Sequence, residues 1–433
     1  MGRATPTVSI KTLGCRSNQA DSDQLAEAFL NAGFDHSKFD SLTDVVIVNT
    51  CTITHVADRK SRQSINKVLR KHPDAIVIVA GCYASVSADL LSELYPTAVI
   101  ANEFTPSRIV SEATRRLPPG LRNELSNRVD AKMLSGDGMR RARPYVKLQD
   151  GCSNVCSFCI VPKARGKSVS RLQSEVLLEA SRLFQAGFEE LVLSGISLGS
   201  YLCPETGVRL GGLVQNILDL SSTGRVRLSS IEPMDFDPAL FDVFSDGRVC
   251  PHFHIPLQSG DDGVLRRMRR PYTTSDYRGI IDKLRAIDES VAISTDVMVG
   301  YCDETQGEFE ATRQFIREVE FAYIHTFPYS RRLGTLAGLH HDSVPSSVKR
   351  NRVSAVTTLN KELSAKYRMR FVGSRRQVLW ENSSGDKCFG VTDNFIRVEG
   401  VLANHKLGKL DDVKLMLGSD PEGAMHGIRA FLR

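Results

Sequence analysis

Three cysteines close together in the sequence carry the strongest chemical signal in this chain. The segment GCSNVCSFCIVP (151–162) spaces Cys152, Cys156 and Cys159 as C-x3-C-x2-C. Thiolates at this spacing lie on one tight loop and can bind a single soft metal centre. A structural zinc site uses four protein ligands, whereas a cubane iron–sulfur cluster held by three cysteines leaves one iron open to a small molecule. The spacing therefore predicts a cluster with an open iron, with three buried free thiols as the alternative.

Three further cysteines follow apolar, strand-like segments in the first third of the chain. The strand-like segments are Thr7–Leu13, Val45–Val48 and Ala75–Ala80. They alternate with helical patterns, which is typical of a parallel α/β sheet. Each segment leads into a cysteine: Cys15, Cys51 or Cys82. Because the carboxyl ends of such strands form the ligand crevice of an open sheet, we predict a second three-cysteine metal site there. Small buried residues at strand ends are the alternative.

The composition describes an ordinary globular protein. Hydrophobic residues make up 41% and charged residues 24% of the 433 residues, and the formal net charge is +6. This mild basic excess is compatible with a nucleic-acid partner. The sequence shows neither a secretory signal nor an apolar run long enough for a membrane helix. Ten cysteines in such a chain indicate metal or redox use in a reducing compartment, so we expect a cytoplasmic protein with no membrane partner.

The phrases around both cysteine trios resemble one known family. C-x3-C-x2-C with Phe158 before the third cysteine resembles the radical SAM enzymes, and the sequence from Val146 to Gly166 resembles their methylthiotransferase branch. The phrases KTLGCRSNQAD (11–21), NTCTITHVADRKSRQ (49–63) and AGCYA (80–84) are similar to the N-terminal domain of the same branch. The resemblance covers nearly the whole chain.

The resemblance implies two [4Fe-4S] clusters and S-adenosylmethionine as cofactors. In the family, the cluster of the C-x3-C-x2-C loop cleaves S-adenosylmethionine to a 5′-deoxyadenosyl radical, and the auxiliary cluster of the N-terminal trio handles sulfur. The N-terminal phrases are most similar to members that methylthiolate C2 of N6-threonylcarbamoyladenosine at position 37 of tRNA. Isopentenyladenosine in tRNA and a ribosomal-protein aspartate are the alternative substrates, and a non-catalytic iron–sulfur RNA-binding protein is the alternative of another class. Implied partners are tRNA, a sulfur donor, and an electron donor such as flavodoxin or ferredoxin.

Strand–helix alternation and the resemblance together predict three domains of α/β and β structure. Residues 1–120 form a parallel α/β sheet domain with the auxiliary cluster, and residues 121–142 form a linker. Residues 143–370 form the radical SAM core, a partial (β/α)6 barrel. Residues 371–433, with short strand-like runs and turns, form a small β-barrel that resembles the RNA-binding TRAM domain.

Several residues at the predicted strand ends of the core are candidates for binding. Ser194 and Gly195 resemble the turn that contacts the methionine amino group of S-adenosylmethionine, and Gln258 and Ser259 offer polar contacts to its adenosine part. Arg331 and Arg332 suit an anionic substrate. After the fifth core strand the family has a Phe-Pro-Gly-Glu turn, where this chain has 301–304, YCDE; loss of the proline and glycine predicts a less rigid turn.

The C-terminal segment has the composition of an RNA platform. Between Lys366 and Arg433 there are 12 basic and 8 acidic residues. Trp380, Phe389 and Phe395 are candidates for exposed aromatic side chains that would stack on bases. A domain that only packs against the core is the alternative.

Overall fold

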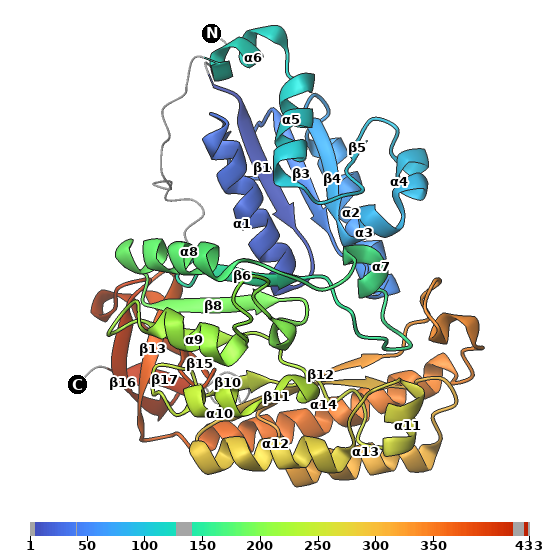
Figure 1. The fold of residues 1–433 in the computed structure, drawn as a ribbon, viewed down its shortest axis with the longest axis vertical. Coiled ribbons are helices and arrows are strands. Elements are labelled where there is room, and N and C mark those ends of the chain that lie inside the picture. The colour runs from blue at the N-terminus through green and yellow to red at the C-terminus, as the bar shows by residue number, and fades with distance from the viewer. Residues whose placement is uncertain (1–4, 40, 127–140, 419–427, 432–433) are drawn as a thin grey trace. The chain divides into compact units, whose positions relative to one another are not determined.

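The computed structural model describes residues 5–39, 41–126, 141–418 and 428–431 and divides the chain into two compact units (Figure 1). The first unit comprises residues 1–140 with the short segments 151–153 and 159–167. The second comprises residues 141–150, 154–158 and 168–433. The radical SAM core and the C-terminal β-barrel, predicted as separate domains, therefore lie in one compact unit.

The first unit is a parallel sheet with helices on both faces. Its strand order is β2-β1-β3-β4-β5, and all neighbours are parallel. The strands are β1 (Thr7–Thr12), β2 (Asp35–His36), β3 (Val45–Thr50), β4 (Ile76–Gly81) and β5 (Val99–Ile100). The helices are α1 (Arg16–Asn31), α2 (His55–Lys71), α3 (Cys82–Val86), α4 (Ala88–Leu94), α5 (Pro106–Arg116) and α6 (Pro119–Ser126). This arrangement confirms the predicted N-terminal sheet.

The continuous apolar run of β3 explains why both faces of this sheet are covered. Val45 and Ile47 pack with α1 and α5, whereas Val46 and Val48 pack with α2, α3 and α4. Helix α6 occupies the start of the predicted linker, and its Leu121 packs against the first of these clusters. Residues 127–140 of the predicted linker lie outside the described residues.

The core of the second unit contains six parallel strands in sequential order. They are β6 (Tyr145–Asp150), β8 (Glu190–Gly195), β9 (Arg225–Leu228), β10 (His252–His254), β11 (Ala292–Val299) and β12 (Tyr323–Pro328), with β7 (Val169–Ser170) antiparallel at the edge. A bridge between Ser230 and His254 joins the β7-β6-β8-β9 sheet to the β10-β11-β12 sheet. The predicted partial barrel is thus confirmed (Figure 1).

Helices follow the core strands and cover their outer face. They are α8 (Gln173–Gln185), α9 (Leu210–Leu218), α10 (Pro238–Phe244), α11 (Asp262–Arg267), α12 (Thr274–Ile287), α13 (Gln306–Val319) and α14 (Ser346–Met369); α7 (Val161–Arg165) belongs to the first unit. Along β11 the side chains alternate: Ile293 and Val297 join the apolar core under the helices, whereas Ser294 and Asp296 take the opposite face. The inner face of β11 therefore carries polar side chains in the middle of the strand.

The C-terminal segment forms a closed barrel in the order β13-β14-β15-β17-β16. Its strands are β13 (Arg375–Ser384), β14 (Lys387–Thr392), β15 (Arg397–Val401), β16 (Leu410–Leu417) and β17 (Ile428–Phe431). The C-terminal barrel packs against the start of the core strands. Arg227 of β9 donates hydrogen bonds there to the carbonyls of Thr392 and Asp393, at 3.0 and 2.9 Å. Two ion pairs also cross this interface, Arg143 with Glu381 at 2.7 Å and Lys409 with Glu189 at 2.8 Å. Within the core, Glu190 pairs with Arg225 and Arg227 next to it.

Two of the three predicted RNA-stacking aromatics are not available at the surface. Trp380 is fully buried, stacks on His405 and donates its indole N–H to Asp411 at 2.7 Å. Phe395 stacks on His252 of the core, with a 4.1 Å distance between ring centroids. Phe389 alone of the three is exposed, at 37%. The expectation was wrong for Trp380, because the inward or outward phase of a short strand depends on a register that sequence does not give. It was wrong for Phe395 because the turn between β14 and β15 places this ring against the core.

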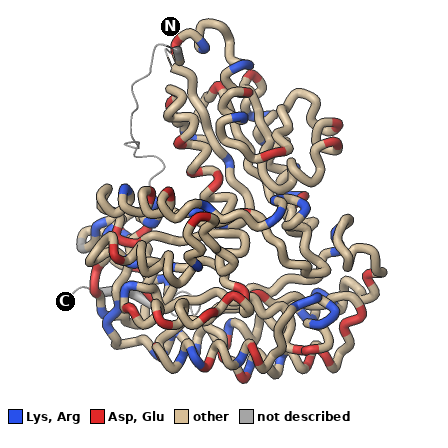
Figure 2. Tube along the Cα trace, in the orientation of Figure 1, with Lys and Arg blue, Asp and Glu red and all other residues tan. Residues whose placement is uncertain are grey.

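Charged residues of both signs are interspersed along the chain. Figure 2 shows Lys and Arg alternating with Asp and Glu on the long helices of the second unit, which agrees with the small net charge of +6. Among the helices of the described residues, none combines the length and apolar character needed to cross a membrane.

Candidate cluster and substrate sites

The N-terminal sheet brings its three cysteines to one edge. Cys15 precedes α1 directly after β1, Cys51 follows β3, and Cys82 begins α3 directly after β4. Strands β1, β3 and β4 are neighbours in the sheet, so the three thiols emerge side by side at its carboxyl edge. Cys15 is exposed, whereas Cys51 and Cys82 are buried.

Asn18 of α1 lies at the centre of this trio. Its Oδ1 atom is 3.7 Å from Cys15 Sγ and 3.8 Å from Cys82 Sγ. Its Nδ2 atom donates hydrogen bonds to the carbonyls of Leu13 and Thr50, at 2.7 and 2.9 Å. Asn18 thus ties together the backbone that leads into Cys15 and Cys51, a role that we did not predict although it lies within the phrase KTLGCRSNQAD.

The surroundings of the N-terminal trio fit a three-cysteine cluster. Burial, with smaller contributions from Cys82 and Cys15, raises the pKa of Cys51 to about 11, so a metal is needed to hold this thiol as thiolate. Gly14 has a φ of +100°, and a Cβ there would lie 2.7 Å from Cys51 Cβ. No three His, Cys, Asp or Glu side chains in the described ranges are placed to bind one metal ion. Cysteines of a cubane bind different irons and lie further apart than ligands of one ion.

The C-x3-C-x2-C loop is closed by tight backbone packing. In the first unit, the backbone N–H of Cys152 donates to the carbonyl of Gly166 at 3.0 Å. Gly151 has a φ of +68°, and a Cβ there would lie 2.0 Å from the carbonyl oxygen of Lys167. Only glycine fits such a close approach, so the segment after Cys159 returns against the segment before Cys152.

In the second unit, a buried arginine lies against the middle cysteine of the loop. Arg270 Nη1 donates to Cys156 Sγ at 3.1 Å, and Arg270 also pairs with Glu232 and donates to Tyr272 Oη. Burial opposes this charge, but Glu232, Tyr272 and Cys156 raise the pKa of Arg270 overall. The guanidinium is therefore a buried cation held in contact with the sulfur atom of Cys156. It was not predicted, because the two residues are far apart in sequence.

The loop residue Ser157 is anchored to two other elements of the second unit. Its hydroxyl donates to the carbonyl of Arg267 at 3.0 Å and lies 2.8 Å from Tyr301 Oη. Its carbonyl accepts from the backbone N–H of Ala337 at 2.6 Å. Phe158 packs edge-to-face with Tyr301. The position of Cys156 is thus fixed by α11 and by the loops after β11 and β12.

The four candidate residues for S-adenosylmethionine differ in how their polar atoms are used. Ser194 Oγ and Gln258 Oε1 are buried and have no hydrogen-bond partner among the described residues, and Gln258 has an unusual φ of +68°. Ser259 is already engaged, since its hydroxyl contacts Thr312 Oγ1 at 3.2 Å and accepts from the Asp261 N–H. A buried oxygen without a protein partner is available to a ligand, so Ser194 and Gln258 are the stronger candidates.

Gly195 keeps the turn after β8 close to β6. A Cβ at this position would lie 3.1 Å from Gln149 Oε1. Gln149 Oε1 accepts from the N–H of Ser197 at 2.9 Å, which fixes the turn that Gly195 opens. This glycine therefore serves close packing at the carboxyl end of β8, next to the buried hydroxyl of Ser194.

The two candidate substrate arginines lie in different environments. Arg331 is exposed, and its Nε atom donates to the carbonyl of Gly338 at 2.9 Å. Arg332 is only 7% exposed, and its carbonyl accepts from Thr335 Oγ1 at 2.8 Å. Of the two, Arg331 has the accessible guanidinium that an anionic substrate needs.

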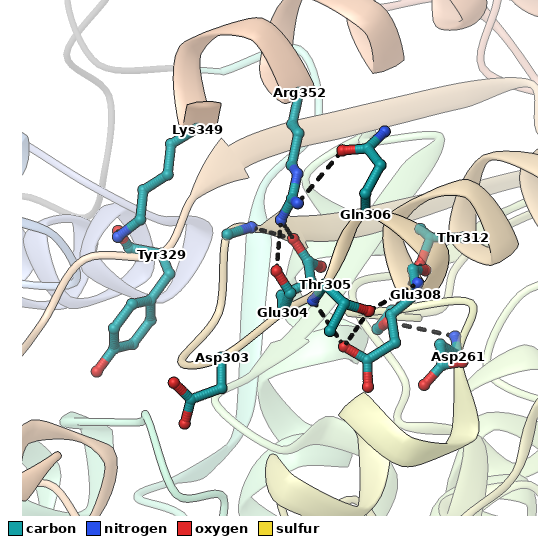
Figure 3. Close-up of polar contacts among 12 residues, drawn as sticks. Asp261, Asp303, Glu304, Thr305, Gln306, Glu308, Thr312, Tyr329, Lys349 and Arg352 are labelled. Atoms are coloured by element: carbon teal, nitrogen blue, oxygen red, sulfur yellow. Dashed lines mark hydrogen bonds and ion pairs between the residues drawn. The ribbon is translucent and has the colours of Figure 1, made fainter. Parts of the chain in front are cut away.

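An ion pair holds the turn after β11, where the family has a proline and a glycine. Figure 3 shows Arg352 of α14 directed at Glu304 and Gln306. Arg352 Nη1 and the backbone N–H of Gly300 each donate to Glu304 Oε2 at 2.5 Å. Thr305 and Glu308 then form a capping box that starts α13. The turn is thus anchored despite its altered sequence.

The inner face of the barrel carries a histidine–aspartate cluster. Asp296 of β11 lies 3.2 Å from His254 Nε2 and 3.2 Å from His325 Nδ1. Burial opposes ionisation of Asp296, but its hydrogen bonds with the two histidines lower its pKa. The same bond to Asp296 raises the pKa of His325. Sequence reasoning did not single out Asp296 or His325.

Comparison with known proteins now places these features in a family. Residues 7–101 match the profile described as "Uncharacterized protein family UPF0004", and residues 146–316 match the Radical SAM superfamily. The threonylcarbamoyladenosine tRNA methylthiotransferase MtaB of Bacillus subtilis (strain 168) is 32% identical over 428 residues, which cover 96% of this chain and 95% of that protein.

A second type of relative is almost as similar in sequence. The tRNA-2-methylthio-N(6)-dimethylallyladenosine synthase of Syntrophotalea carbinolica is 31% identical over 393 residues, which cover 87% of this chain and 88% of that protein. Among solved structures, the radical S-adenosylmethionine methyltransferase TsrM of Kitasatospora setae matches with a TM-score of 0.52 at 14% identity, over 77% of this chain and 73% of that one. The last match supports the fold alone.

Proposed function

The chain belongs to the methylthiotransferase branch of the radical SAM superfamily, and from this premise we propose that it inserts a methylthio group at C2 of N6-threonylcarbamoyladenosine at position 37 of tRNA. Similarity over almost the full length of the Bacillus subtilis relative carries the substrate assignment. When bound, a [4Fe-4S] cluster and S-adenosylmethionine supply the 5′-deoxyadenosyl radical that takes a hydrogen atom from an unreactive carbon.

We propose that the two cysteine trios hold two separate clusters. Cys152, Cys156 and Cys159 would hold the cluster that receives S-adenosylmethionine, with Arg270 donating a hydrogen bond to Cys156 Sγ. The N-terminal trio, Cys15, Cys51 and Cys82, would hold the auxiliary cluster that handles sulfur. Its position at the carboxyl edge of an α/β sheet, where ligands of this fold class bind, supports this assignment.

The remaining candidate residues would bind and orient the organic groups. Ser194 and Gln258 offer unpartnered buried oxygens for S-adenosylmethionine, with Gly195 and Ser259 shaping the same strand ends. The threonylcarbamoyl group carries a carboxylate, which an exposed arginine such as Arg331 can bind. The apolar dimethylallyl group offers no such partner to an arginine. Arg332 would position the loop beside it.

Recognition of tRNA would use surfaces that remain exposed in the second unit. Phe389, at 37% exposure, and the exposed Arg397 are the candidates on the C-terminal barrel. Point variants are the suitable test, because truncation of the barrel would uncover Arg227 and Glu190 of the core. Loss of one phosphate contact should reduce the slope of log affinity against log salt by about 0.9.

Two further partners follow from the chemistry that we propose. Reductive cleavage of S-adenosylmethionine requires one electron, which flavodoxin or ferredoxin would supply in the cell. Repeated turnover requires a donor that replaces each sulfur atom transferred to the product. Both reagents have chemical substitutes, dithionite and sulfide, so that the protein can be assayed without its natural partners.

The test compares tRNA substrates in a defined reaction. Reconstituted protein receives S-adenosylmethionine, dithionite, sulfide and tRNA that carries either threonylcarbamoyladenosine or isopentenyladenosine, and nucleosides are analysed by mass spectrometry. We expect the methylthio product from the first tRNA only. Product from the second tRNA alone would reassign the substrate. In a parallel reaction with ribosomal protein in place of tRNA, modification of an aspartate would do the same. Absence of 5′-deoxyadenosine would favour a non-catalytic iron–sulfur RNA-binding protein.

A further inference from the structure

Arg165, the last residue of α7, reaches the N-terminal cysteine trio within the first unit. Its Nε atom donates to Cys82 Sγ at 3.1 Å. Its Nη2 atom donates to Asn18 Oδ1 at 2.6 Å and pairs with Asp21 Oδ2 at 2.7 Å. One guanidinium thus contacts a cysteine thiol, the asparagine at the centre of the trio and an α1 carboxylate.

The contact between Arg165 and Cys82 is buried, so solvent weakens the effect of the arginine charge on the sulfur atom only slightly. The Arg165 side chain is 7% exposed and that of Asp21 is fully buried, and Asn18 is fully buried as well. Charge-assisted hydrogen bonds are shorter and stronger than neutral ones, and a dry site screens them little. Asp21 holds the guanidinium fork in a fixed orientation that points Nε at the sulfur atom of Cys82.

The same segment also contacts the other cysteine trio. Arg165 follows Cys159 by six positions in the sequence. The next residue, Gly166, accepts a hydrogen bond from the backbone N–H of Cys152 at 3.0 Å. Within the first unit, the segment that follows the C-x3-C-x2-C loop therefore contains Arg165, the cation in contact with Cys82.

We propose that Arg165 is a positioning residue for the auxiliary cluster, donating an N–H···S hydrogen bond to its ligand Cys82 and thereby raising the reduction potential of that cluster. This inference rests on the auxiliary cluster of the proposed function. Hydrogen bonds to ligand sulfurs and the net charge around a cluster set its potential, and partners of first-shell ligands orient those ligands. A cation at Cys82 stabilises the reduced cluster, which carries one more negative charge.

The test measures the potential of the auxiliary cluster alone. In the full chain, Cys152, Cys156 and Cys159 are replaced by Ala, the protein is reconstituted anaerobically, and the midpoint potential is followed by electron paramagnetic resonance. Arg165→Gln removes the charge and the guanidinium fork and leaves a shorter, neutral amide, whereas Arg165→Lys keeps the charge. Lys163→Gln removes one positive charge from the exposed side of the same helix and serves as the matched control.

We expect Arg165→Gln to disfavour reduction about tenfold, which is about 59 mV for one electron. Lys163→Gln should leave the potential unchanged, and Arg165→Lys should fall between wild type and Arg165→Gln. An unchanged potential in Arg165→Gln at full iron content would overturn the proposal. If Arg165→Gln fails to hold iron, Arg165→Lys decides: a lowered potential supports the proposal and an unchanged one contradicts it. A parent protein without any cluster would instead refute the auxiliary cluster itself, and this inference with it.

Discussion

The two cysteine trios reach their positions in different ways. Cys152, Cys156 and Cys159 are neighbours in the sequence, and the loop that carries them needs long-range partners such as Arg270 to fix it. Cys15, Cys51 and Cys82 are far apart in the sequence, and adjacent strands of one sheet bring them together. A local motif can thus be read directly from its spacing, whereas a site built by topology becomes visible only when the strands are arranged.

The largest effect should come from removing the local trio. Replacing Cys152, Cys156 and Cys159 by Ala should abolish cleavage of S-adenosylmethionine, because no open iron remains in the core. Iron content should fall from about eight to about four atoms per chain if both sites hold cubanes. Iron analysis and chromatographic detection of 5′-deoxyadenosine check both results. An unchanged iron content would place the cluster elsewhere.

Two glycine variants should each disturb the backbone beside one cysteine trio and so reduce iron binding at that trio alone. A Cβ at Gly81 would lie 2.3 Å from Asn49 Oδ1, and at Gly151 it would lie 2.0 Å from the carbonyl oxygen of Lys167. Both glycines have positive φ, so alanine also adds strain of about 1–3 kcal/mol. Gly81→Ala should reduce iron at the N-terminal site and Gly151→Ala at the loop.

Measuring each glycine variant in a background that lacks the other cysteine trio shows which cluster is affected. Gly166→Ala is the control, because its φ of +75° is similar but a Cβ there meets no atom within 4 Å. Equal losses at both sites from either variant would contradict the separation.

A smaller effect is expected from replacing Arg270, which contacts Cys156 of the loop. Arg270→Gln should lower the rate of 5′-deoxyadenosine formation about 10- to 100-fold, as for other residues that contact a metal ligand. The exposed Arg266 of α11 provides the control variant Arg266→Gln, with the same change in charge. A rate equal to that of the control would show that Arg270 only packs against Glu232 and Tyr272.

The smallest effect concerns the histidine–aspartate cluster on the inner face of the barrel. His325 has a raised pKa, so its bond to Asp296 stabilises the fold below the ordinary value of 6.5 and this contribution is lost as pH rises through the folded pKa. Asp296 has a lowered pKa, so its contribution is present above its ordinary value of 3.8 and is lost on acidification. Asp296→Asn should lower the pKa of His325, measured by nuclear magnetic resonance. A value that stays raised would exclude Asp296 as the cause.

Local pattern and topology predicted the sheet, the six-stranded core and the β-barrel. They also predicted that Cys15, Cys51 and Cys82 meet at one edge, because strand ends can be located from apolar runs. Sequence did not reveal Asn18 or Arg165 as neighbours of the thiols, since Arg165 and Asn18 are 147 positions apart. The exposure of Trp380 was mispredicted for a related reason, because it depends on barrel register. Side-chain contacts between distant segments are thus the part that sequence reasoning missed.

The central claim is that radical formation and sulfur transfer use different cysteine trios. The most direct test replaces Cys15, Cys51 and Cys82 by Ala and measures two products of one reaction with tRNA. We predict that 5′-deoxyadenosine still forms while methylthiolated nucleoside is absent, because only the loop cluster is needed to cleave S-adenosylmethionine. Methylthiolated nucleoside at the wild-type level would show that the N-terminal trio has only a structural role and would contradict the claim.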